Sequence, residues 1–271
     1  MRNLEFETWD HGRLRVNRAF AELLRAHNLT TFDALMHSPQ VEVTKSLQRE
    51  RATFRMNLQD GDAERGFYLK RHGPGPWKEY LKSFVRLRWP ILGARNEWNA
   101  ILRFHKIGIP TMTPVALGEH SGYSFLMTEA IEDHVKLSDW MAAHLPAREA
   151  PVRHAARQIL RAVAQVARSM HRAGLHHQDF YAGHLLLPRD RSEVRVIDLG
   201  RARARFPLRS HWIVKDLAQL HYSTGALSRG DCMRFLREYF GRPLTAADRR
   251  LIRRVQAKSQ AIARHSRKNS L

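Results

Sequence analysis

The chain has 271 residues and a formal net charge of +20 at pH 7, from 46 Lys and Arg against 26 Asp and Glu. One cysteine, Cys232, excludes a disulfide within the chain, and the lack of any run of about 18 apolar residues excludes a membrane-spanning helix. The first residues lack the apolar core of a secretory signal, so the cytoplasm is the expected compartment. The one-sided charge favours a polyanionic partner, which is nucleic acid, anionic lipid or a phosphorylated glycolipid.

The hydrophobic period of the chain changes at about residue 40. Residues 1–40 are predicted to form a helical appendage, because apolar residues recur there at helical spacing. These residues are Val16, Ala19, Phe20, Leu23 and Leu24. Beyond them the pattern predicts strands over 41–43, 52–58 and 66–70, with a hairpin turn at 60–62.

A helix is predicted over 97–107, followed by two strands over 113–118 and 123–129. The rest of the chain is rich in amphipathic helical patterns. They cover 152–173, 212–220, 229–240 and the residues after the N-cap candidate Thr245. This change from mainly strands to mainly helices divides the chain into a β-rich lobe, 41–130, and an α-rich lobe, 131–271.

Lys70 ends an apolar strand, and Glu97 lies in the first turn of the next helix, 27 positions later. A lysine in this place can reach a nucleotide phosphate, and the carboxylate can pair with the lysine. Two other interpretations stay open from these residues alone. Lys70 can be an edge lysine that faces solvent, and Glu97 can merely complement the helix dipole.

Two aspartates carry the strongest chemical signal. Asp179 lies within the segment 175–187 and Asp198 within the segment 194–200, and each segment contains a short apolar run typical of a strand. Their separation of 19 positions suits phosphoryl transfer, in which one Asp orients a hydroxyl and the other holds Mg²⁺. The alternative is a β-hairpin with two solvated aspartates.

The order of these parts resembles the protein-kinase fold, an α+β architecture with a β-rich N-lobe, one main helix in it, and a helical C-lobe. The resemblance implies that Lys70 is the lysine of the third kinase strand and that Glu97 is its helix partner. It also places Glu129 and Ile131 at the hinge, which meets adenine through backbone groups.

The motifs of the second lobe extend this resemblance. His177-Gln178-Asp179 resembles the kinase His-Arg-Asp, and Asp198-Leu199-Gly200 resembles Asp-Phe-Gly. His184 stands where protein kinases have a metal-binding Asn.

Several runs are similar to one branch, the lipopolysaccharide kinase family of Gram-negative bacteria, which includes heptose and Kdo kinases. The runs are Pro90–Trp98, Thr111–Glu119, Met170–Gly174, Asp179–Leu187, Ile197–Ala202, Lys215–Ala218 and Phe235–Phe240. Like this family, the chain has a Tyr two residues and a His five residues after Asp179. The likeness covers roughly residues 41–245. The heptose I kinase branch is the nearest, and Kdo kinase stays open.

The family resemblance implies an ATP- and Mg²⁺-dependent kinase that phosphorylates a sugar hydroxyl, of heptose or Kdo, in the lipopolysaccharide inner core. Asp179 is expected to orient the hydroxyl, while Lys70 and Glu97 steady the ATP phosphates. Asp198 is expected to hold Mg²⁺, with His184 as a second metal contact or a neutral hydrogen-bond partner.

The implied acceptor is anionic and anchored at the cytoplasmic face of the inner membrane, so the +20 charge is expected to steer the protein there. The basic and aromatic segment 77–95 and the basic helix after Thr245 are the candidate contacts. That helix can equally be a docked helix with a basic outer face. No nucleic-acid partner is expected, and an acyl-carrier-type protein is left open as a partner.

Besides Gln178 in place of Arg and His184 in place of Asn, the chain departs from protein kinases in two places. No Gly-rich loop precedes Lys70, and Arg49 or Arg51 is expected to assist at the phosphates instead. No long activation segment ending in Ala-Pro-Glu follows Asp198, which disfavours a peptide substrate.

Two other functions are kept as alternatives. A protein kinase or small-molecule kinase is one, although the basic charge disfavours cationic aminoglycosides. A basic, nucleic-acid-binding pseudokinase is the other, and the complete set of Lys70, Glu97, Asp179 and Asp198 disfavours it.

Overall fold

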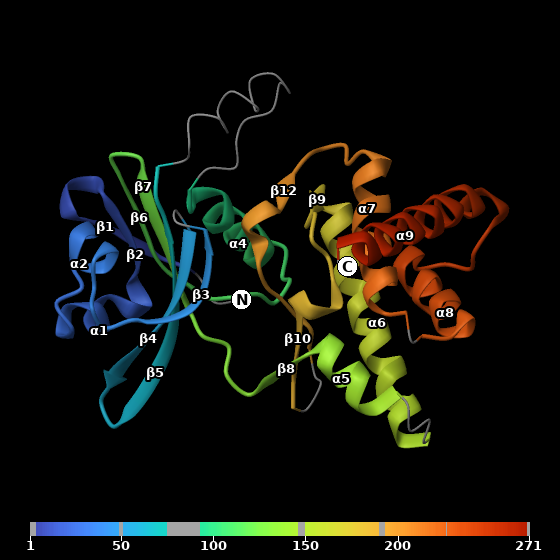
Figure 1. The fold of residues 1–271 in the computed structure, drawn as a ribbon, viewed down its shortest axis with the longest axis horizontal. Coiled ribbons are helices and arrows are strands. Elements are labelled where there is room, and N and C mark those ends of the chain that lie inside the picture. Colours follow the sequence, from blue (N-terminus) through green and yellow to red (C-terminus); the bar gives the residue numbers. More distant parts are fainter. Residues whose placement is uncertain are drawn as a thin grey trace. The chain divides into compact units, whose positions relative to one another are not determined.

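The computed structural model divides the chain into two compact units (Figure 1). The first unit consists of Met1–Arg103 and Met112–Glu132, and the second of Phe104–Thr111 and Asp133–Leu271. The residues that the structure describes are 4–48, 51–74, 93–145, 150–189, 193–225 and 227–269.

The first unit is built on an antiparallel sheet, which has seven strands among the described residues, in the order β1-β2-β6-β7-β5-β4-β3. The strands are β1 (Phe6–Trp9), β2 (Leu14–Asn17), β3 (Glu42–Gln48), β4 (Arg51–Asp60), β5 (Ala63–His72), β6 (Pro114–His120) and β7 (Tyr123–Glu129). All strands predicted after residue 40 are therefore present. β4 and β5 form a hairpin whose turn contains Gly61 at a φ of 63°, a conformation that glycine adopts without strain.

Residues 1–40 differ from the predicted helical appendage. Two short helices are present, α1 (Ala21–Ala26) and α2 (Phe32–Met36), but β1 and β2 belong to the sheet of the first unit. Leu14 and Val16 are buried, whereas Arg15 between them is exposed. This alternation is the period of a strand, and it overrides the helical spacing that begins at Val16.

Side chains of α1 and α2 share one core with the sheet of the first unit. Leu24 and Leu35 from the helices are completely buried, as are Phe67 and Leu69 from β5. The ring of Phe20 meets the ring of Phe67 edge-on at a centroid distance of 6.0 Å. This packing fixes β5, the strand that carries Lys70.

Helix α4 (Arg95–Lys106) runs from the first unit into the second. Trp98, Ile101 and Phe104 are buried at helical spacing. Gly108 follows with a φ of 74°, and the Ile109 N–H donates to the carbonyl oxygen of Phe104, which ends the helix. The predicted helix is confirmed, and its first turn contains Glu97.

The second unit is mainly helical, as predicted. Its helices are α5 (Leu137–His144), α6 (Ala150–Arg172), α7 (Ser210–Ser223), α8 (Arg229–Phe240) and α9 (Arg249–Asn269). Its short strands are β8 (His134–Lys136), β9 (Leu175–His176), β10 (Leu185–Pro188), β11 (Arg195–Val196) and β12 (Arg203–Ala204). They pair as β11-β10-β8 and as β12-β9, so Asp179 lies in the loop after β9 and Asp198 in the turn after β11.

Helix α9 packs against α7 and turns most of its basic residues to solvent. Val255 and Ser259 are buried, and Ser259 is hydrogen-bonded to His221 of α7 at 2.9 Å. The Asp248 carboxylate accepts a hydrogen bond from the Thr245 N–H at 2.8 Å, which caps the start of this helical region as predicted. In the part of the chain that the structure describes, none of the helices has the length and apolar character needed to cross a bilayer.

Candidate active site

Lys70 and Glu97 form an ion pair in the first unit. The Nζ of Lys70 lies 2.7 Å from an Oε of Glu97, whose side chain is only 4 % exposed. Because β5 has β4 and β7 on its two sides, Lys70 is not an edge lysine. A carboxylate this deeply buried needs such a partner, since breaking a buried pair costs about 3–5 kcal/mol. The structure brings together the two residues that the kinase resemblance pairs, and their contact with nucleotide stays a prediction.

The predicted hinge, Glu129 to Ile131, leaves the sheet at the end of β7. The Glu129 carboxylate pairs with Arg65 at 2.5 Å, and the Ala130 N–H donates to the carbonyl oxygen of Gly66 at 2.8 Å. These contacts fix the course of the segment and occupy the Glu129 side chain. The contact of Glu129 and Ile131 with adenine, through backbone groups, stays a prediction.

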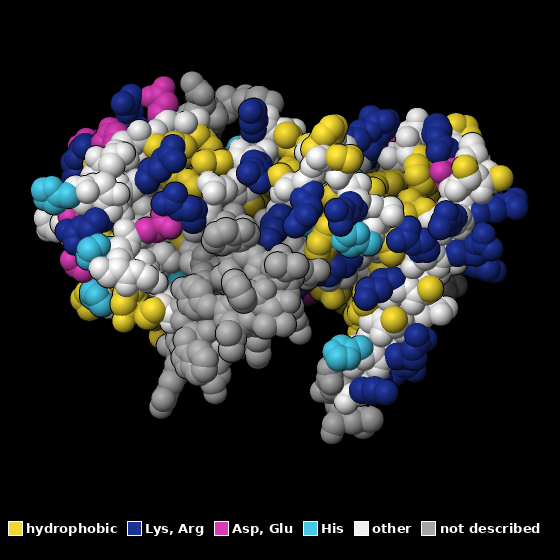
Figure 2. Space-filling view, turned by 90° about the horizontal axis from the view of Figure 1, so that it is seen from above, with side chains coloured by type: hydrophobic (Ala, Val, Ile, Leu, Met, Phe, Trp, Pro, Cys, Tyr) yellow, Lys and Arg dark blue, Asp and Glu magenta, His cyan; other side chains and the backbone are white. Residues whose placement is uncertain are grey.

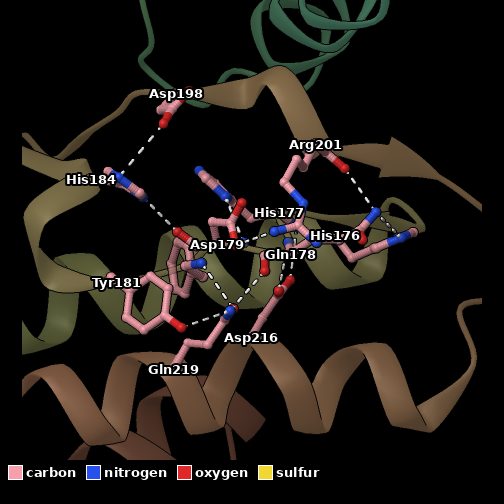
Figure 3. A network of polar contacts seen from close by, with 11 residues as sticks. His176, His177, Gln178, Asp179, Tyr181, His184, Asp198, Arg201, Asp216 and Gln219 are labelled. Carbon is pink, nitrogen blue, oxygen red and sulfur yellow. Dashed lines mark hydrogen bonds and ion pairs between the residues drawn. The ribbon is translucent and has the colours of Figure 1, made fainter. Parts of the chain in front are cut away.

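Asp216, on α7 of the second unit, anchors the loop that carries Asp179 (Figure 3). Its carboxylate accepts hydrogen bonds from the backbone N–H groups of His177 and Gln178, both at 2.8 Å, and lies 3.3 Å from the Nε2 of His171. Burial of Asp216 by itself raises its pKa, but the hydrogen bonds with His171 and His177 outweigh burial and lower the pKa below its usual range. A buried, ionised carboxylate therefore holds the loop backbone in place.

Gln219, three residues after Asp216, holds the same loop at a second point (Figure 3). Its side-chain oxygen accepts from the Phe180 N–H at 3.1 Å, and its amide donates to the carbonyl oxygen of Gln178 at 2.7 Å and to the Tyr181 hydroxyl at 3.2 Å. Gln178 has a φ of 73°, a conformation that costs a residue other than glycine roughly 1–3 kcal/mol. The contacts from α7 compensate for this cost and set the loop conformation.

His184 links the two aspartates of the predicted site. Its Nδ1 donates to the backbone carbonyl oxygen of Asp179 at 2.7 Å, which makes Nε2 the ring nitrogen that is available to other groups. This Nε2 faces the Asp198 carboxylate at 3.7 Å (Figure 3). Asp198 has a left-handed backbone conformation with a φ of 58°, which is a feature that concentrates at functional sites.

His177 ties the Asp179 loop to the turn that carries Asp198. Its ring lies parallel to the His184 ring at a centroid distance of 5.9 Å. Its Nε2 donates to the carbonyl oxygen of Ile197 at 3.0 Å, and burial lowers its pKa below 6.5, so the ring is neutral at pH 7.

Arg201 forms an ion pair with Asp179. The distance between a guanidinium nitrogen and the Oδ1 of Asp179 is 3.1 Å, and the Asp179 side chain is 23 % exposed. The side-chain amide of Gln178 donates to the backbone carbonyl oxygen of Arg201 at 2.8 Å, which fixes the backbone at this point. The exposed head group of Arg201 orients one oxygen of Asp179 and leaves the other without an ion pair among the described residues.

The donor set near Asp198 fits Mg²⁺. The described residues contain no cluster of three or more His, Cys, Asp and Glu suited to a metal, but Asp198 with His184 offers two donors. A nucleotide-bound Mg²⁺ needs only one or two protein ligands, because phosphates and water supply the others. Oxygen is the preferred donor, so Asp198 suits the metal itself, and the Nε2 of His184, which faces Asp198, suits a metal-bound water.

Sequence reasoning missed Asp216, Gln219 and Arg201 as parts of this site. Asp216 and Gln219 lie three positions apart on the buried face of α7, among apolar residues. Two polar residues at that spacing on an apolar helical face are a usable signal, because buried polar groups need partners. Arg201 is separated from Asp179 by 22 positions, and no pattern in the sequence connects the two.

Some predictions lie outside the described residues. They concern Arg49 and most of the basic and aromatic segment, residues 77–92, and the structure likewise leaves the side chain of Arg51 undescribed.

A β-rich unit with a lysine–glutamate ion pair and a helical unit with an anchored His177-Gln178-Asp179 loop define a protein-kinase-like phosphotransferase. Comparison with known proteins then identifies the family. Residues 35–239 match the lipopolysaccharide kinase (Kdo/WaaP) family, and the chain belongs to it.

The relatives agree with this family. The chain is 40 % identical over 197 residues to the lipopolysaccharide core heptose(I) kinase WaaP of Pseudomonas aeruginosa, covering 66 % of this chain and 71 % of that protein. It is 34 % identical over 248 residues to the enzyme of the same name from Escherichia coli, covering 86 % and 91 %. A solved structure described as WaaP in complex with acyl carrier protein superposes with a TM-score of 0.73 at 32 % identity, covering 92 % of this chain and 98 % of that one. The predicted family, kinase-like α+β fold and lipopolysaccharide kinase function are confirmed.

Proposed function

We propose that this protein transfers the γ-phosphoryl group of ATP to a hydroxyl of a heptose in the lipopolysaccharide inner core. The observation that carries the proposal is the anchored loop of Asp179, held by Asp216 in a chain that belongs to the lipopolysaccharide kinase family. The relatives named heptose(I) kinases favour heptose over Kdo as the acceptor sugar.

In the proposed reaction Asp179 orients the acceptor hydroxyl and takes its proton. The hydroxyl oxygen forms a bond to the γ-phosphorus while the bond to the ADP oxygen breaks. Lys70, held by Glu97, contacts the ATP phosphates. Asp198, with His184 beside it, is the proposed Mg²⁺ ligand, and the bound ion would neutralise phosphate charge. Positioning and charge stabilisation supply most of the rate.

The acceptor sugar can be tested directly. Purified protein is incubated with ATP, Mg²⁺ and either a heptose-containing inner-core acceptor or an acceptor truncated to Kdo, and the products are analysed by mass spectrometry. We expect one phosphate on the heptose-containing acceptor and none on the truncated one. Phosphate on the truncated acceptor would identify a Kdo kinase instead.

The Lys70→Met variant tests the ATP contact in the same assay. We expect kcat/KM for ATP to fall by about 10- to 100-fold, because hydrogen bonds to a charged group contribute about 1.5–3 kcal/mol. Lys136→Met, at an exposed position of β8, is the matched control and should behave as wild type. The thermal unfolding of the Lys70 variant must be measured as well, because the substitution removes the ion-pair partner of Glu97 and can lower stability. An unchanged ATP dependence in a folded Lys70 variant would contradict the proposed role.

We further propose that the protein works at the cytoplasmic face of the inner membrane as a peripheral protein. The support is its net charge of +20 and the distribution of that charge. Figure 2 shows Lys and Arg side chains over much of the face in view, with few Asp and Glu among them on the helical unit. Exposed basic residues continue along the outer side of α9, which supports the membrane-facing interpretation of this docked helix.

An acyl-carrier protein is a proposed partner. The second unit contains a mainly apolar, partly open cavity of about 330 Å³, lined mostly by residues of α5 to α9. Among them are Trp140, Ala156, Leu160, Leu220, Phe235 and Ile252. A cavity of this character suits an acyl chain. The relative solved with acyl carrier protein supports the same partner class for this chain.

Filling the cavity tests this partner. Ala156→Phe places a ring in the cavity, so we expect the affinity for a long-chain acyl-carrier protein to fall at least about tenfold, the effect of roughly 1.4 kcal/mol. Binding of the carrier without its acyl chain should not change. Calorimetric titration with the two carrier forms measures both. Equal loss for the two forms, or no loss for either, would show that the cavity does not hold the chain.

A further inference from the structure

The segment that joins β12 to α7 exposes an aromatic side chain in a basic stretch. Phe206 is 89 % exposed, more than any other large hydrophobic side chain among the described residues. The stretch 199–215 contains no Asp or Glu. Its basic residues are Arg201, Arg203, Arg205, Arg209 and Lys215.

The base of this loop is held in place. The Arg205 N–H donates to the carbonyl oxygen of Gly174 at 2.7 Å, and β12 pairs with β9. A Cβ at Gly174 would lie 2.5 Å from the Arg205 carbonyl oxygen, so glycine permits this close approach. At the far end the Trp212 N–H donates to the carbonyl oxygen of Arg209 at 3.0 Å, and the Trp212 ring stacks on His176. The tip therefore projects from a fixed base.

The loop is also connected to the catalytic loop within the second unit. Arg201, two residues before β12, pairs with Asp179 and is held through its backbone by Gln178. The catalytic carboxylate and the loop are therefore joined through Arg201, five residues before Phe206 in the chain. Figure 2 looks down on the side where this segment lies in Figure 1, and Lys and Arg side chains surround apolar ones there.

We propose that residues 205–209 form a membrane anchor, in which Phe206 enters the headgroup region of an anionic bilayer and Arg205 and Arg209 contact lipid phosphates. An aromatic ring flanked by arginines is the composition of interfacial segments. A stable protein interface needs a broader apolar centre, whereas Arg205, Pro207 and Arg209 around Phe206 are exposed and mostly charged. The anchor rests on the proposed function in that it presents a lipid-linked acceptor to Asp179.

The test is co-sedimentation of the full-length protein with vesicles of phosphatidylglycerol and phosphatidylethanolamine. We expect Phe206→Ser to weaken vesicle binding about tenfold, the effect of losing part of the burial of one aromatic side chain. Tyr123→Ser, at an aromatic residue that is 44 % exposed in the first unit, is the matched control and should bind like wild type. Phe206→Trp should retain binding and gain fluorescence quenching by lipids with brominated chains.

Kinase activity separates the anchor from the proposed function. With a soluble, delipidated core acceptor the Phe206→Ser variant should match wild type, and with vesicle-bound acceptor its KM should rise while kcat stays. Unchanged vesicle binding in this variant would overturn the anchor and leave the kinase proposal intact. If Phe206→Ser loses binding to acyl-carrier protein but still binds vesicles, the loop contacts an acidic protein and the anchor is overturned. Loss of activity on the soluble acceptor would place Phe206 in the active site and also overturn the anchor.

Discussion

Replacement of Asp179 by asparagine is expected to lower kcat by about 10²- to 10⁴-fold, the range for loss of a general base. Asparagine keeps the size of the side chain but cannot accept the hydroxyl proton. The backbone carbonyl oxygen of Asp179, which His184 binds at 2.7 Å, remains available in the variant. The geometry around His184 and Asp198 should therefore survive, so binding of ATP should change little.

Steady-state kinetics with purified acceptor, together with nucleotide-dependent thermal shifts, measure these two effects separately. Asp62→Asn, at an exposed turn residue of the first unit, is the matched control for removal of one carboxylate. An Asp179→Asn enzyme that turns over at nearly the wild-type rate would refute the assignment of Asp179. If Asp179→Asn loses both turnover and nucleotide binding, Asp179 maintains the structure of the site and does not act on the hydroxyl.

The sequence predicts the parts of the site that local patterns encode. Lys70 follows an apolar strand pattern and Glu97 opens an amphipathic helix, so both periodicity and spacing indicate where the two residues lie. Asp179 and Asp198 stand in motifs whose residue types are tied to phosphoryl transfer. For these four residues the prediction needs only the order of elements along the chain, and the order of strands and helices predicted after residue 40 agrees with the structure.

The parts that escaped prediction depend on contacts between distant segments. Lys215 and Asp216 lie in a run that is similar to the family, but only the packing of α7 shows that Asp216 is buried while Lys215 is partly exposed. The pairing of β2 with β6 brings together residues about 100 positions apart, which no local period specifies. The contact of Arg201 with Asp179 likewise follows a turn in which Asp198 has a positive φ. Tertiary structure decides each of these features.

Asp216→Ala is expected to lower the free energy of unfolding by about 2–5 kcal/mol and to reduce kcat strongly. The substitution leaves the buried backbone N–H groups of His177 and Gln178 without their acceptor, and each such loss costs roughly 1–3 kcal/mol. Because those two residues directly precede Asp179, the catalytic carboxylate loses its fixed position as well. Chemical denaturation and steady-state kinetics measure the two effects. Asp231→Ala serves as a control for kcat, since Asp231 is partly exposed and its carboxylate pairs with Ser228 and Arg234 at the start of its own helix.

The pH dependence of stability distinguishes the charge of Asp216 from its shape. The pKa of Asp216 is lower in the folded protein than in the unfolded chain. Its charge therefore contributes fully to the free energy of unfolding above the unfolded-state pKa of about 3.9. This contribution is lost as the pH falls through the pKa of the folded protein. Asp216→Asn preserves the shape and one acceptor oxygen but removes the charge. Wild type should therefore be more stable than Asp216→Asn at pH 7, and the difference should shrink as the pH falls below about 4. A difference that stays constant with pH would mean that packing at this position, and not the ionised carboxylate, holds the catalytic loop.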